Sequence, residues 1–197
     1  MLKSVVSVLA ALVFAAPGAA PTPDVTTAFS CAADLGVGIR SKRKFCDIVI
    51  SAAPKEGVTM TIPPHTGPTT LRFDLHNRYT LGAANATPAQ MYARHTAAIA
   101  VLDQNGAVVG RAAVSRELRA EVDLFDRIAG GMGPGGAIAV APGRPEPVVL
   151  ELPEAVSVIA VVGLALEASS LAEEGTFTTP GRPVAAGSNF RIEYTRK

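Results

Sequence analysis

The sequence contains no tryptophan, and aromatic residues make up only 5% of its 197 residues. Sugar-binding clefts stack their ligands on aromatic side chains, so this shortage argues against a carbohydrate-degrading enzyme. The formal net charge of +1 argues against nucleic acid and anionic membrane surfaces as main partners. Hydrophobic residues nevertheless reach 48%. A sizeable core is therefore expected, built mainly from valine, alanine, leucine and isoleucine.

Common catalytic motifs are also missing. Neither Gly-x-Ser-x-Gly nor His-Glu-x-x-His occurs in the chain, so two frequent hydrolase signatures are lacking. The carboxylate pair of a glycosidase is defined by its spacing in the fold, so a hydrolase with dispersed carboxylates remains an alternative. We expect a non-catalytic protein that uses no cofactor.

The first 20 residues have the pattern of a secretory signal peptide. Lys3 supplies the positive charge, an apolar run follows over residues 5–16, and small residues with Pro17 close the segment. We expect cleavage between residues 15 and 22 and a single β-rich domain over residues 21–197, exported to the periplasm or the extracellular space. The apolar run is short for a membrane helix, so no membrane span is expected in the mature chain. The high alanine, glycine and arginine content favours a bacterial source.

Cys31 and Cys46 are the only cysteines. In an exported protein, an even cysteine count predicts a disulfide bond. The loop between them contains the densest basic run of the chain, made by Arg40, Lys42, Arg43 and Lys44. This run is either a solvated turn or a binding patch for an anionic partner such as a cell-surface polymer.

Most of the chain reads as short strands separated by turn signals. Residues 70–81 alternate between apolar and polar side chains, and an Asn-Gly pair at residues 105–106 predicts a hairpin turn. The apolar segment at residues 156–166 is expected to be buried on both faces or to break at Gly163. About nine or ten such strands favour an antiparallel β-sandwich, with a β-barrel as the alternative.

One helix is expected within this sandwich, from Ser115 to Ala129. Ser115 is a good N-cap residue, and apolar residues recur from there at helical spacing, namely Leu118, Val122, Phe125 and Ala129. The competing strand interpretation would bury Asp126. We therefore favour the helix.

A glycine cluster at residues 130–136 follows this segment. A phosphate-binding loop precedes a helix and ends in Gly-Lys-Ser/Thr, and this cluster does neither, so nucleotide binding is not indicated. The cluster is either a connector or a place where a ligand approaches the backbone closely. On the second interpretation, Gly130, Gly131 and Gly133 are candidate binding residues.

Three residues are candidate metal ligands. Asp74 and His76 are two residues apart on a predicted strand and so point the same way, and His95 begins a later strand. Two histidines and one carboxylate form a common set of metal ligands. The alternative is that Asp74 and His76 belong to the solvated face of an amphipathic strand.

These observations favour an exported, soluble β-sandwich that acts as a non-catalytic binding or accessory module in the periplasm or at the cell surface. Its partner would be a protein or a component of the cell envelope. The first alternative is a metal-binding or metal-carrying protein that uses Asp74, His76 and His95. The second alternative is the hydrolase with dispersed carboxylates.

Overall fold

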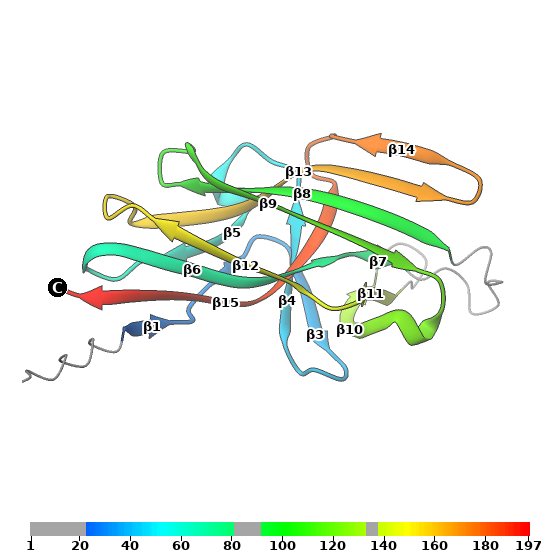
Figure 1. Cartoon of the computed structure of the whole chain (residues 1–197), viewed down its shortest axis with the longest axis horizontal. Helices are drawn as coiled ribbons and strands as arrows, with labels where there is room; N and C mark the ends of the chain where they lie inside the picture. Colours follow the sequence, from blue (N-terminus) through cyan, green and yellow to red (C-terminus); the bar gives the residue numbers. More distant parts are fainter. Residues whose placement is uncertain (1–22, 81–91, 133–137) are drawn as a thin grey trace, which may run out of the picture.

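The computed structural model describes residues 23–80, 92–132 and 138–197. About 68% of these residues form β-strands, which pair antiparallel in two packed sheets (Figure 1). This arrangement confirms the predicted mainly β sandwich. The predicted signal peptide and Gly133 of the glycine cluster lie outside the described residues.

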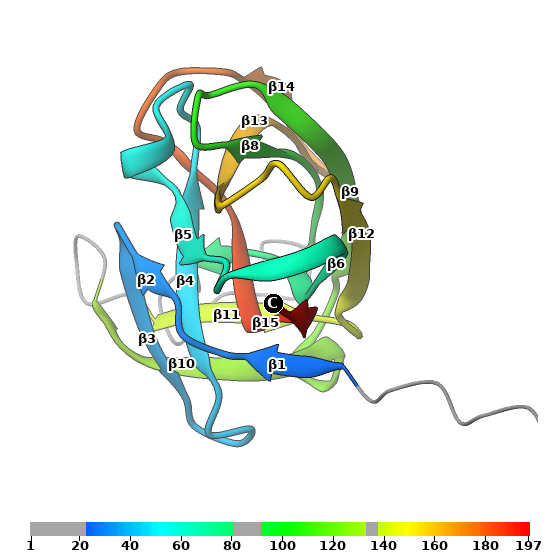
Figure 2. The same cartoon turned by 90° about the vertical axis from the view of Figure 1, so that its left-hand side faces the viewer.

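The larger sheet has nine strands and curls into a half-barrel (Figure 2). Its strands are, in spatial order, β12 (Glu146–Leu152), β6 (His65–Asn77), β15 (Pro183–Arg196), β4 (Lys44–Val49), β3 (Asp34–Gly38), β10 (Leu124–Met132), β11 (Ile138–Pro142) and β7 (Tyr79–Thr80), with β1 (Asp24–Thr26) paired to β15. The sheet curls because β7 follows β6 along the chain and pairs with β11 at the far end of the strand order.

The smaller sheet has six strands and covers one face of the larger one. Its strands are, in order, β2 (Ser30–Cys31), β5 (Val58–Thr61), β13 (Val158–Ser170), β8 (Ala93–Asp103) and β9 (Val108–Leu118), with β14 (Glu174–Phe177) paired to β13. Two single-turn 3₁₀ helices, η1 (Pro54–Glu56) and η2 (Glu121–Asp123), connect strands.

The main hydrophobic core lies between the two sheets. Leu71, Phe73 and Leu75 of β6 are buried in it, as the alternating pattern predicts. Ile159 and Val161 of β13 contribute from the opposite sheet. A second, smaller cluster is formed by residues of the larger sheet whose neighbours in β4 and β15 point into the main core, and it comprises Leu35, Phe45, Ile128, Ala141 and Ala186.

Two local predictions are confirmed in the smaller sheet. The Asn-Gly turn joins β8 to β9, with Gly106 at a φ of 82°. The segment at residues 156–166 is buried on both faces at Val161 and Val162, and its pairing with β8 shifts register after Gly163. The strands are longer than predicted, since β6 and β13 have 13 residues each and β15 has 14.

The predicted helix over Ser115–Ala129 is wrong. The segment is extended, because β9 continues to Leu118 and β10 begins at Leu124, with only the short turn η2 between them. Val122, expected on the apolar face, is 90% exposed. The apolar residues that recur at helical spacing therefore belong to the end of β9, the turn η2 and the start of β10, and not to one helix.

The physical reason for the error is the carboxylate of Asp126. The strand interpretation was rejected because it would bury this side chain, and Asp126 is indeed only 3% exposed. Its oxygens accept hydrogen bonds from the backbone N–H groups of Arg40 (2.9 Å), Ser41 (2.8 Å) and Arg127 (2.8 Å). A buried charge that is satisfied in this way is compatible with a strand.

The cysteine pair lies where it links the two sheets. Cys31 ends β2 of the smaller sheet, and Cys46 is buried in β4 of the larger one. Their Cα atoms are 5.4 Å apart and the side chains are at disulfide distance, which is consistent with the predicted bond.

Removing this link should destabilise the protein measurably. The loop spans a sequence separation of 15 residues, so the variant C31A/C46A should lose about 3 kcal/mol of unfolding free energy in a urea titration. Reduction with dithiothreitol should lower the melting temperature of the parent protein and leave that of the variant unchanged. If oxidised and reduced parent proteins melt together, the predicted bond is wrong.

Candidate functional site

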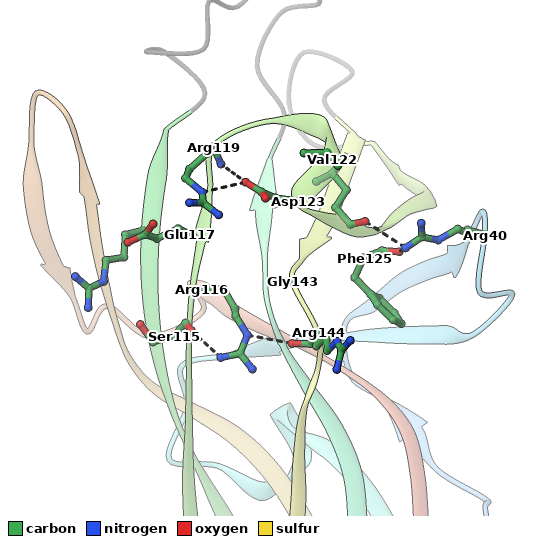
Figure 3. Close-up of a pocket in the computed structure, with 12 residues that line it drawn as sticks. Arg40, Ser115, Arg116, Glu117, Arg119, Val122, Asp123, Phe125, Gly143 and Arg144 are labelled. Carbon is green, nitrogen blue, oxygen red and sulfur yellow. Dashed lines mark hydrogen bonds and ion pairs between the residues drawn. The ribbon is translucent and has the colours of Figure 1, made fainter.

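A cavity of about 620 Å³ opens at one end of the sandwich, where β9, η2, β10 and the turn between β11 and β12 meet (Figure 3). Its lining includes five arginines, which define what we call the arginine pocket: Arg40, Arg94, Arg116, Arg119 and Arg144. Only two carboxylates, those of Glu117 and Asp123, line the same cavity. The site therefore carries an excess of positive charge.

Two of these arginines are held by neighbouring groups. The guanidinium of Arg116 donates to Glu146 Oε2 (3.0 Å) and to the carbonyl oxygens of Arg144 (3.1 Å) and Ser115 (2.8 Å). Arg119 Nε lies 3.4 Å from Asp123 Oδ2. Asp123 also accepts a hydrogen bond from the backbone N–H of Arg119. This hydrogen bond is the main reason that the pKa of Asp123 lies below its usual value. Figure 3 shows Arg119 and Asp123 above Arg116 and Arg144 around the opening.

Arg40, Arg94 and Arg144 form no ion pair within the described part of the chain, and of these three only the guanidinium of Arg40 is held by backbone carbonyl oxygens. Arg94 and Arg144 are both exposed residues. Arg144 follows Gly143, whose φ of 65° lies in the left-handed region that favours glycine. A side chain at Gly143 would also overlap Arg116. This turn therefore presents one uncompensated guanidinium beside an anchored one.

Phe125 provides an apolar wall between this pocket and a smaller one. The guanidinium of Arg40 lies 5.9 Å from the centre of the Phe125 ring and donates to the carbonyl oxygens of Leu124 and Phe125. Arg40, Leu124 and Phe125 also line the second cavity, of about 230 Å³, which extends to the exposed Ile39. Charged and apolar surface thus lie side by side at this end.

Asp126 positions Arg40 at the pocket. Its carboxylate binds the backbone of Arg40 and Ser41 in the turn between β3 and β4. Burial would raise the pKa of Asp126, and the hydrogen bonds from Ser41, Arg40 and Arg127 outweigh it, so the pKa is lowered. Gly38 allows this close approach, because a side chain there would overlap the carboxylate.

Replacing this carboxylate should loosen the turn. In Asp126→Asn, an amide N–H₂ would face donors that now bind a charged oxygen, so we expect a loss of about 1–3 kcal/mol in unfolding free energy. Amide hydrogen exchange should also become faster at Arg40 and Ser41. Asp34→Asn is the control: it removes an exposed ion pair with Lys44 and keeps an amide oxygen that can accept the backbone N–H of Gly36, so it should change stability little. Unchanged exchange at the turn would contradict this role of Asp126.

The predicted basic run is only partly at the site. Arg40 lines the pocket, and Lys42 is an exposed residue of the turn with a φ of 58°. Arg43 forms an ion pair with Asp74 (2.6 Å), and Lys44 forms one with Asp34 (3.1 Å). The run is therefore a partly neutralised turn that contributes one side chain.

The remaining candidate binding residues are the glycines. Gly130 and Gly131 belong to β10, and Gly133 lies outside the described residues.

The three candidate metal ligands are engaged separately. Asp74 is bound by Arg43. His76 is 1% exposed, and His95 stacks on Tyr79 with ring centres 3.9 Å apart. Across residues 23–80, 92–132 and 138–197, no three histidine, cysteine, aspartate or glutamate side chains gather as a metal site.

His76 instead forms a buried pair with Ser188. His76 Nε2 and Ser188 Oγ lie 3.0 Å apart, and both side chains are enclosed by the fold. A nucleophilic serine needs a neighbouring base, as here, and also access for its substrate. Ser188 has no exposed surface, so the geometry assigns this pair a structural role.

Burial sets the ionisation of His76. Burial first, and then the positive charge of Arg43, lower the pKa of His76 from 6.5 to about 3. The folded protein therefore keeps this imidazole neutral at a pH where the unfolded chain binds a proton. Stability due to His76 is fully present above pH 6.5 and is lost as the pH falls toward 3.

Acid titration should reveal this contribution. Between neutral pH and about pH 5, protonation of His76 in the unfolded chain should remove on the order of 2 kcal/mol of stability. His76→Gln should show a shallower loss over this range in urea titrations at each pH. The pKa of His95 is also lowered, mainly by burial, so a smaller slope should remain in the variant. Identical pH profiles for the two proteins would contradict the assignment.

Comparisons with family models, with curated proteins and with solved structures found no match. Among the described residues, no helix is long and apolar enough to cross a membrane. The functional argument therefore depends on the site itself.

Sequence reasoning missed four of the five pocket arginines. Arg116 and Arg119 fell within the segment interpreted as a helix, Arg94 begins a strand, and Arg144 lies in a proline-rich turn. A count of basic residues near predicted strand ends and turns is the only sequence signal that could have grouped them.

Proposed function

We propose that this protein is an exported, non-catalytic binding module that receives an anionic group of a protein or cell-envelope partner in the arginine pocket. The observation that carries the proposal is Arg144, which forms no ion pair within the described residues and lies beside the anchored Arg116, together with Arg94 in the same cavity lining. Guanidinium groups bind carboxylates and phosphates through paired hydrogen bonds. Arg116 and Arg119 are each paired with a carboxylate, so the excess positive charge of the pocket comes from its other arginines.

The chemistry of the pocket supports binding rather than catalysis. Ser115 is the hydroxyl in its lining, and its Oγ lies 2.9 Å from Thr96 Oγ1 rather than beside a base. Guanidinium groups remain protonated at any physiological pH and are poor proton carriers. The lining therefore offers recognition of charge.

The proposal predicts salt-dependent binding of polyanions. Polyglutamate and polyphosphate serve as probes of the two anion chemistries, with binding measured by calorimetry at low and high salt. We expect the parent protein to bind at least one probe, and the variant R94Q/R144Q to bind it about tenfold or more weakly, because each lost charge-assisted hydrogen bond contributes about 1.5–3 kcal/mol before solvent screening.

The matched control is Arg111→Gln, which removes an exposed arginine of β9 outside the pocket lining. It should bind both probes like the parent protein. Equal weakening by the control and the pocket variant would attribute binding to overall charge and overturn the proposed site. The proposed site would also be overturned if the parent protein bound neither polyglutamate nor polyphosphate.

A further inference from the structure

The end of the molecule that carries the arginine pocket also carries an acidic hairpin. We use this name for the tip between β13 and β14, residues 170–174, which contains Glu173 and Glu174. Both are exposed, and neither forms an ion pair within the described residues. Figure 1 shows this hairpin and the strand end that leads into η2 on the same, right-hand side of the molecule.

The arginine pocket and the cavity next to the acidic hairpin are both lined by Arg94. Strand pairing places Glu117, Arg94, Ser169 and Glu174 in one row across β9, β8, β13 and β14. Arg94 lines the arginine pocket and also a cavity of about 580 Å³ that includes Glu167 and Glu174. Positive and negative surfaces are therefore adjacent on one continuous face.

The arginine pocket and the acidic hairpin each carry an exposed apolar residue. Val122, in the lining of the arginine pocket, is 90% exposed, and Leu171, at the tip of the acidic hairpin, is 70% exposed. These are the two most exposed large hydrophobic residues of the described ranges. Exposed apolar side chains next to complementary charge are typical of an interaction surface.

We propose that two copies of this chain pair end to end about a two-fold axis, with the acidic hairpin of each copy in the arginine pocket of the other. A two-fold interface uses the same patch on both copies, so the patch must be self-complementary. This patch meets that requirement in charge, since it carries Glu173 and Glu174 at the same end as Arg94 and Arg144. The inference depends on the proposed function, because it names the carboxylates that fill the anion site.

Sedimentation analysis over a concentration series tests the pairing. We expect the parent protein to form a dimer at low salt that dissociates at high salt or on addition of polyglutamate. The pocket variant R94E/R144E and the hairpin variant E173R/E174R should each raise the dimer dissociation constant about a hundredfold or more, because like charges then face each other.

Complementation distinguishes a direct contact from a folding defect. Mixing the pocket variant with the hairpin variant should restore a dimer containing one copy of each, and a chain with all four changes should dimerise with itself. The control R111E/E154R changes two exposed residues outside the lining of both cavities and should dimerise like the parent protein. Failure of the mixture and of the fourfold variant to dimerise would overturn the proposal.

The inference and the proposed function fail in different ways. A parent protein that binds polyglutamate through Arg94 and Arg144 but stays monomeric at every concentration would overturn the pairing and leave the anion site standing. A protein that neither dimerises nor binds polyanions would overturn both. Assemblies larger than a dimer would overturn the two-fold arrangement.

Discussion

The position of Arg40 at the candidate site depends on one buried carboxylate. Asp126 lies in β10, yet it binds the backbone of Arg40 and Ser41 in a turn that is distant in sequence. These bonds fix the β3–β4 turn against β10, where Arg40 can reach the carbonyl of Phe125. The same hydrogen bonds stabilise the buried charge and order the turn. One side of the candidate site is thus held by a buried carboxylate.

The sequence was informative wherever local pattern and burial agreed. The alternation in β6, the Asn-Gly turn and the doubly buried segment of β13 all follow from short-range rules. The segment from Ser115 to Ala129 failed because its apolar spacing suited a helix, and because the partners that satisfy Asp126 lie about 85 residues away. A long-range hydrogen bond of this kind leaves no periodic signal.

The site itself was less predictable than the fold. Arg40 was recognised within a dense basic run, but Arg43 and Lys44 of that run are neutralised by Asp74 and Asp34. Arg94 and Arg144 are isolated in sequence and meet only because β8 pairs with β9 and the β11–β12 turn lies beside them. Net positive potential in this protein comes from topology rather than from local composition.

The position of β15 has a consequence for how the chain reaches this structure. This strand comes last among the strands, and it pairs with β1, β4 and β6, which all lie in the first half of the chain. Closing such long loops is slow compared with forming a hairpin such as β8–β9. Until β15 arrives, β4 and β6 expose unpaired edges of the kind that promote aggregation. The chain is therefore most exposed to aggregation in the interval before β15 pairs with these strands.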